Sequence, residues 1–117
     1  MELISRNMGK VKILELTGSF DRLNVEPVRQ WIENAIASDP AFLVVNLNKV
    51  DFLDSSALAI LVSGLKKARQ QRGDLRICGL RQSVRLLFEL TRLDKVFEIY
   101  LSEDDAVQGY AYIEATF

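Results

Sequence analysis

Two short segments of this sequence carry clustered polar side chains whose types and spacing could do chemistry. Residues 18–22, Gly-Ser-Phe-Asp-Arg, form an expected tight turn that supplies one carboxylate, Asp21. Residues 46–58 end with an acid and two hydroxyls, Asp54, Ser55 and Ser56. Such groups can cap a helix, accept a phosphoryl group or meet a protein partner.

The acid and the two hydroxyls stand at the start of an expected helix, and this position has two interpretations. In the first, Asp54 or Ser55 is the N-cap, because both residue types accept hydrogen bonds from the free amides of the first turn. In the second, a serine is phosphorylated, because a phosphate at a helix N-terminus meets exposed amides and the positive end of the helix dipole. The phosphate would add nearly two negative charges beside Asp54, near Asp21, and would repel a docked partner while the fold survives.

The composition excludes several other kinds of chemistry. No histidine occurs in the 117 residues, which removes the usual general base, the Ser-His and Cys-His pairs and the commonest metal ligand. We therefore expect no enzymatic activity, no metal and no cofactor. Fifteen Lys and Arg against sixteen Asp and Glu leave a formal charge of −1, so direct binding to nucleic acid is not expected.

The expected compartment is the cytoplasm. The apolar stretches are far shorter than the roughly 20 residues of a membrane-spanning helix, so membrane insertion is not expected. The charged start of the chain does not read as a secretory signal, and the single Cys78 cannot form an internal disulfide. Cys78 falls within an apolar run, which predicts a buried thiol.

The hydrophobic pattern predicts one α/β domain over residues 1–117. Apolar runs predict strands, and apolar positions spaced three and four apart predict helices. A hairpin followed by alternating helix and strand indicates a mostly parallel central sheet with an N-terminal antiparallel hairpin and about four helices. Gly18 is expected to end the second strand, Asn24 to be the N-cap of the first helix, and the first turns of the second helix to be deeply buried. The expected strands are residues 2–6, 11–17, 42–47, 75–80 and 96–101, and the expected helices are residues 25–36, 58–68, 84–88 and a stretch from about 102.

The order and spacing of three motifs resemble those of the STAS-domain anti-sigma factor antagonists, also called anti-anti-sigma factors. The motifs are Gly-Ser-Phe-Asp at 18–21, Val-Asp-Phe-Leu-Asp-Ser-Ser-Ala-Leu at 50–58, and Ser-Val-Arg-Leu-Leu-Phe-Glu-Leu-Thr-Arg-Leu-Asp at 83–94. The resemblance covers nearly the whole chain and implies a single STAS domain. Ala57 and Ala59 depart from the pattern, because glycine is usual there.

The resemblance also implies a mechanism of partner switching. An anti-sigma factor serine kinase would bind the unmodified protein and phosphorylate Ser55 with its own ATP, which ends the binding until a serine phosphatase restores the hydroxyl. The implied partner-binding residues are Asp21, Asp54, Ser55, Ser56 and Ala57. Among them, Asp21 and Asp54 would shape the local charge, and Ser56 would help to cap the helix.

Two other classes of function stay open at this point. STAS-like domains also serve as constitutive interaction subunits of lipid-transport and other regulatory complexes, without a phosphorylation cycle. An enzyme would have to use Asp54, Ser55 or Asp21 without histidine or a metal cluster.

Overall fold

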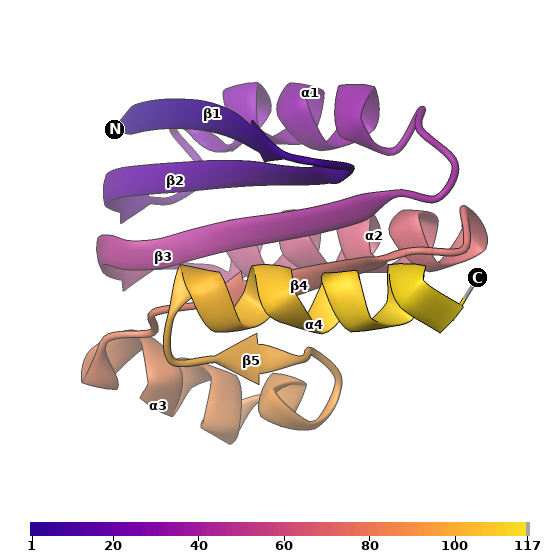
Figure 1. The fold of residues 1–117 in the computed structure, drawn as a ribbon. Coiled ribbons are helices and arrows are strands. Elements are labelled where there is room, and N and C mark those ends of the chain that lie inside the picture. Colours follow the sequence, from indigo (N-terminus) through magenta and orange to yellow (C-terminus); the bar gives the residue numbers. More distant parts are fainter. Residues whose placement is uncertain (117) are drawn as a thin grey trace.

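The computed structural model describes the backbone of residues 1–116 and the side chains of residues 1–111. These residues form one five-stranded sheet with the strand order β1-β2-β3-β4-β5 (Figure 1). The first two strands pair antiparallel and the other neighbours pair parallel. The predicted α/β fold, with its opening hairpin and four α-helices within the described residues, is confirmed. The elements are β1 (Glu2–Met8), β2 (Val11–Phe20), α1 (Val25–Ala35), β3 (Phe42–Leu53), α2 (Ser55–Gln70), β4 (Asp74–Cys78), α3 (Gln82–Leu90), the short 3-10 helix η1 (Leu93–Lys95), β5 (Ile99–Tyr100) and α4 (Glu103–Thr116).

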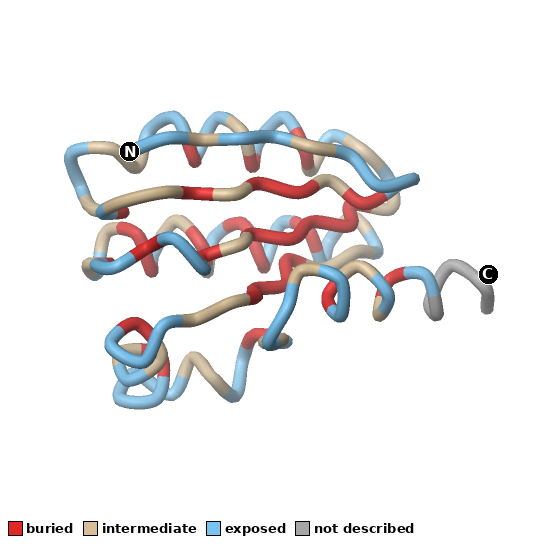
Figure 2. The backbone as a smooth tube through the Cα atoms, turned by 60° about the vertical axis from the view of Figure 1, so that its left-hand side comes forward, coloured by how far each residue is buried: buried red, intermediate tan, exposed pale blue. Residues whose placement is uncertain are grey.

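The sheet separates two apolar cores, because successive side chains of a strand point to opposite faces. On β2, Leu14 and Leu16 join the larger core under α1, α2 and α3, whereas Val11 and Ile13 join the smaller core under α4. In Figure 1, α4 lies in front of the sheet, with α1 and α2 behind it. The buried residues follow the middle strands and the inward sides of the helices (Figure 2). The loops that follow the strands therefore lie at the ends of the sheet, outside the two cores.

Three predicted strands have a boundary wrong by three residues or more, whereas the boundaries of β1 and β4 differ by at most two. Gly18 does not end β2, because the strand continues to Phe20. The φ of Gly18 is +102°, a conformation that glycine adopts readily, and it accompanies a shift of register between β2 and β3. The third strand continues from the predicted Leu47 to Leu53, because its polar second half still pairs with β2. The last strand, β5, spans only Ile99–Tyr100 instead of the predicted residues 96–101.

The expected deep burial of the first turns of α2 is wrong in part. Leu58 and Leu61 are buried, but Ser55, Ala59 and Ser63 are exposed. The helix covers the sheet with one side only, so these small residues face solvent. An accessible side of α2 therefore begins at Ser55.

Tyr110 fastens α4 to the sheet. Its buried hydroxyl lies 2.8 Å from the carbonyl oxygen of Leu43 and 2.7 Å from that of Asp74, between β3 and β4. The ring stacks on Phe42 with 4.7 Å between the centroids, and the Arg76 guanidinium lies 4.0 Å from the ring centroid on the other side. Burial raises the pKa of Tyr110, so the hydroxyl keeps the proton that it donates.

We expect Tyr110→Phe to lower the free energy of unfolding by about 1–3 kcal/mol, because two buried carbonyl groups lose the hydroxyl. Urea denaturation followed by circular dichroism measures the change. Tyr100→Phe is the matched control, since the Tyr100 hydroxyl makes no hydrogen bond to the described side chains or backbone. Equal stability of the two variants would contradict the anchoring role of the Tyr110 hydroxyl.

Candidate functional site

The two polar segments singled out by the sequence meet at the carboxyl ends of β2 and β3. The amide of Asp54 donates to the carbonyl oxygen of Phe20 at 3.3 Å, and the amide of Arg22 donates to Oδ2 of Asp54 at 3.0 Å. This edge of the sheet lies at the left of Figure 1, where β2 and β3 end. We call Asp21 to Asn24 together with Asp54 to Ser56 the switch edge.

Asp54 is the N-cap of α2, which decides between the two capping candidates. Its extended backbone precedes the helix, and its Oδ1 accepts a hydrogen bond from the amide of Ala57 at 3.0 Å. The Ala57 amide above all, then the amides of Arg22 and Ser56 and the charge of Arg22, hold the pKa of Asp54 below its usual value against partial desolvation. The carboxylate is therefore ionised at neutral pH, and its two oxygens join the loop after β2 to the start of α2.

The loop after β2 is held by its own side chains. Oδ1 of Asp21 accepts from the amide of Leu23 at 3.0 Å, and Oδ1 of Asn24 accepts from the amide of Asp21 at 2.8 Å. The Asn24 amide group also donates to the carbonyl oxygen of Ser19 at 2.6 Å. Asn24 occupies the predicted N-cap position of α1, but its side chain makes no capping hydrogen bond and stabilises this loop instead.

The remaining predicted site residues differ in access to a partner. Ser55, the first residue of α2, is exposed, and its hydroxyl makes no hydrogen bond to the described residues. Ser56 is half-buried, and its hydroxyl likewise makes none, so capping falls to Asp54 rather than to Ser56. Ala57 is fully buried in the larger core, which makes its side chain unavailable for the predicted partner contact. Ala57 contributes to the site through its backbone amide, which donates a hydrogen bond to Asp54.

At this place the sequence interpretation missed the exposed Leu23 and named Ala59 only as a departure from the family pattern. Leu23 is 86 % exposed on the loop that Asp21 and Asp54 hold. Ala59 is exposed one helical turn after Ser55, and the spacing of four between these residues was the signal that both lie on one side of α2. These residues widen the accessible surface around Ser55.

The surface next to Ser55 is broad and shallow. A hollow of about 620 Å³ runs along the outer side of α2, and all its lining residues belong to that helix: Ser55, Leu58, Ala59, Val62, Ser63, Lys66, Lys67 and Gln70. A surface on a single helix offers no walls for a small ligand. It suits contact with another protein.

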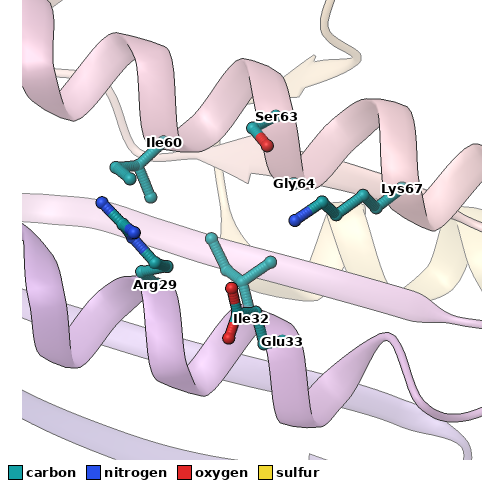
Figure 3. Close-up of a pocket in the computed structure, with 7 residues that line it drawn as sticks. All are labelled: Arg29, Ile32, Glu33, Ile60, Ser63, Gly64 and Lys67. Atoms are coloured by element: carbon teal, nitrogen blue, oxygen red, sulfur yellow. The ribbon is translucent and has the colours of Figure 1, made fainter.

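A second hollow lies between α1 and α2 and holds about 200 Å³ (Figure 3). Figure 3 shows Arg29 and Lys67 on either side of Ile32, with Glu33 and Ser63 at the rim. A Cβ on Gly64 would lie 2.9 Å from Cγ2 of Ile32, so glycine permits the close approach of the two helices. The small volume and the mixed charges make this hollow a junction between helices rather than a candidate ligand site.

Three other properties were considered for the described part of the chain: a metal site, a reactive thiol and a membrane-spanning helix. Among the side chains of residues 1–111, no three His, Cys, Asp or Glu residues gather as a metal site would require. Cys78 is buried as predicted, and burial raises the pKa of its thiol to about 12, which keeps it protonated. None of the helices described has the length and apolar character needed to cross a membrane.

Comparison with known proteins places these features in a family. The model described as "STAS domain" matches residues 4–106. The chain is 29% identical over 98 residues to the anti-sigma F factor antagonist of Paenibacillus polymyxa, which covers 83% of this chain and 84% of the relative. A crystal structure of an anti-sigma factor antagonist from Mycobacterium paratuberculosis superposes with a TM-score of 0.83 at 28% identity, over 92% of each chain.

The fold is also that of SpoIIAA, an anti-sigma factor antagonist solved in two forms. The unphosphorylated form superposes with a TM-score of 0.81 over 94% of this chain and 96% of that chain. The phosphorylated form superposes with a TM-score of 0.73 over 93% of this chain and 99% of that chain. At 19% identity, both establish a shared fold.

We expect Asp54→Ala to lower the melting temperature by about 5 °C, because the cap of α2 and the bond to Arg22 are lost together. Ser55→Ala should leave the melting temperature nearly unchanged, because the Ser55 hydroxyl makes no hydrogen bond to the residues that the structure describes. Differential scanning calorimetry compares the two variants. A loss in Ser55→Ala as large as that in Asp54→Ala would assign the cap to Ser55 instead.

The stability contributed by Asp54 should depend on pH. Its pKa is lowered in the folded state, so its contribution is complete above the ordinary aspartate pKa of about 4 and is lost as pH falls through the folded value. Asp54→Asn cannot titrate at this position. The difference in urea midpoint between the unaltered protein and Asp54→Asn should therefore shrink below about pH 4, and a constant difference down to about pH 2 would contradict this assignment.

Proposed function

This chain belongs to the STAS domain family of anti-sigma factor antagonists, and from this premise we propose that it binds an anti-sigma factor through the switch edge until Ser55 is phosphorylated. Such antagonists are non-enzymatic regulators, which act by binding. The partner in this proposal is an anti-sigma factor that is itself a serine kinase. Binding would free the sigma factor that the kinase holds.

The exposure of the Ser55 hydroxyl is the single observation that carries the proposal. This hydroxyl has no role in the fold, since Asp54 caps α2 and leaves Ser55 without a hydrogen bond to the described residues. The first turn of α2 contains no acidic residue, so a phosphate on Ser55 would meet the positive end of the helix dipole without a competing carboxylate inside the helix. The modification can therefore be carried without unfolding α2.

The proposed release follows from the charges beside Ser55. The depressed pKa of Asp54 keeps its carboxylate ionised, and the phosphate adds nearly two more negative charges next to it. A partner fitted closely to the uncharged hydroxyl would meet both a bulkier group and a stronger negative field. Asp21 and Asp54 serve here by holding the loop that carries Arg22 and Leu23.

The phosphoryl transfer balances with the kinase as the source of ATP. The γ-phosphoryl group of ATP forms an ester with Oγ of Ser55, ADP leaves, and the hydroxyl proton is released to a base on the kinase or to water. A serine phosphatase hydrolyses the ester with water and restores the hydroxyl, with inorganic phosphate as the second product. No cofactor of this chain is needed.

The test is titration of purified anti-sigma factor kinases from the same organism with variants of this protein. We expect Ser55→Asp to bind at least tenfold more weakly than the unaltered protein while its melting temperature stays the same, because only the surface charge changes. Ser55→Ala should bind like the unaltered protein. Gln108→Glu is the matched control, since it adds a charge to an exposed position on α4, across the sheet.

Equal affinity of Ser55→Asp and the unaltered protein would contradict the switch. It would favour a constitutive interaction subunit instead.

A further inference from the structure

An apolar groove lies beside the switch edge, between the end of β3 and α3. It holds about 280 Å³, and its lining residues are Asp51, Phe52, Leu53, Ser83, Val84, Leu86, Leu87 and Leu90. Phe52 and Leu86 are each 53 % exposed, and Leu90 is 74 % exposed. Three large apolar side chains thus face solvent around one hollow and form a contiguous patch, and the largest such patch on a monomeric protein is often functional.

The exposed leucines of α3 are not needed by the core. Val84 and Phe88 already bury the inward side of this nine-residue helix in the larger core. Leu86 and Leu90 are four residues apart and lie on another side, so α3 is apolar toward the core and again toward the groove. The second apolar side has no partner among the described residues.

The carboxylates of the switch edge accept hydrogen bonds from the chain itself, so affinity for a partner has to come from other side chains. The two oxygens of Asp54 accept from the amides of Arg22 and Ala57, and one oxygen of Asp21 accepts from the amide of Leu23. These carboxylates are engaged in holding the chain. The buried centre of a protein interface is more apolar than its rim and poor in charged residues, and the exposed Phe52 of the apolar groove stands two residues before Asp54.

The size of the groove decides what can occupy it. Its volume lies at the lower limit of the roughly 300–1,000 Å³ of small-molecule sites, and suits one or two apolar side chains of a protein. Its three exposed side chains offer on the order of 300–400 Å². That is about half of the roughly 800 Å² that each partner buries in a stable interface, so a second copy held by the groove alone would bind weakly.

We propose that the apolar groove holds an apolar segment of the same anti-sigma factor that contacts the switch edge. The inference rests on the proposed function and adds the place where most of the affinity arises. One partner that covers both surfaces buries the groove and the Ser55 hydroxyl together. The groove then supplies affinity for the anti-sigma factor, and a phosphate on Ser55 weakens the binding of the same partner.

The test uses the kinase that binds the unaltered protein, and compares affinities by isothermal titration. The double variant Leu86→Ser with Leu90→Ser should bind at least tenfold more weakly, at an unchanged melting temperature, because both side chains are exposed. Phe52→Ser tests the other wall of the groove, on β3, and should also bind more weakly. Leu101→Ser is the matched control, since Leu101 is 84 % exposed just before α4 and does not line the groove.

The outcomes separate this inference from the proposed function. If Ser55→Asp releases the kinase but the groove variants bind as tightly as the unaltered protein, the groove proposal is overturned and the switch remains. If no kinase binds, both proposals fail. Light scattering addresses the other occupant: an unaltered protein that is dimeric, with groove variants that are monomeric, would assign the groove to a second copy and overturn the proposal.

Discussion

The bridge made by the Asp54 carboxylate is the interaction on which the rest of the site depends. One oxygen accepts from the amide of Ala57 and begins α2, and the other accepts from the amide of Arg22 and holds the loop after β2. Because Asp54 performs both tasks, the neighbouring Ser55 hydroxyl is left free of the fold. The Ser55 hydroxyl can therefore be modified without removal of the cap of α2.

The sheet supplies the rigid support for this bridge. Its two faces are covered by helices, with Tyr110 joining α4 to the carbonyl groups of Leu43 and Asp74 on one side and the larger core on the other. At the carboxyl ends of β2 and β3, the loops are joined by the hydrogen bonds that Asp54 makes with Phe20 and Arg22. The apolar groove lies along the same edge, between β3 and α3, so the proposed affinity and its proposed control by charge would come from adjacent parts of one surface.

Local patterns were sufficient to predict the order of the elements and the meeting of the two polar segments. They failed where the outcome depends on neighbours in space. The prediction that Gly18 ends a strand used an ordinary residue preference, which pairing with β3 overrode. Asn24 lies at the predicted N-cap position of α1, but its side chain bonds the loop around Asp21 instead of the helix. The burial of Ala57 and the exposure of Leu23 follow from packing, which periodicity does not contain. The groove at Leu86 and Leu90 was missed for the same reason.

The most direct test of the central claim is the intact mass of this protein isolated from its own cells, before and after phosphatase treatment, with mapping of the peptide that spans residues 51–66. We expect a single phosphoryl group on Ser55 that phosphatase removes. An unmodified protein under both growth and stress would contradict the claim that Ser55 is a phosphorylation switch. A phosphoryl group found elsewhere in the chain would contradict the assignment of that switch to Ser55.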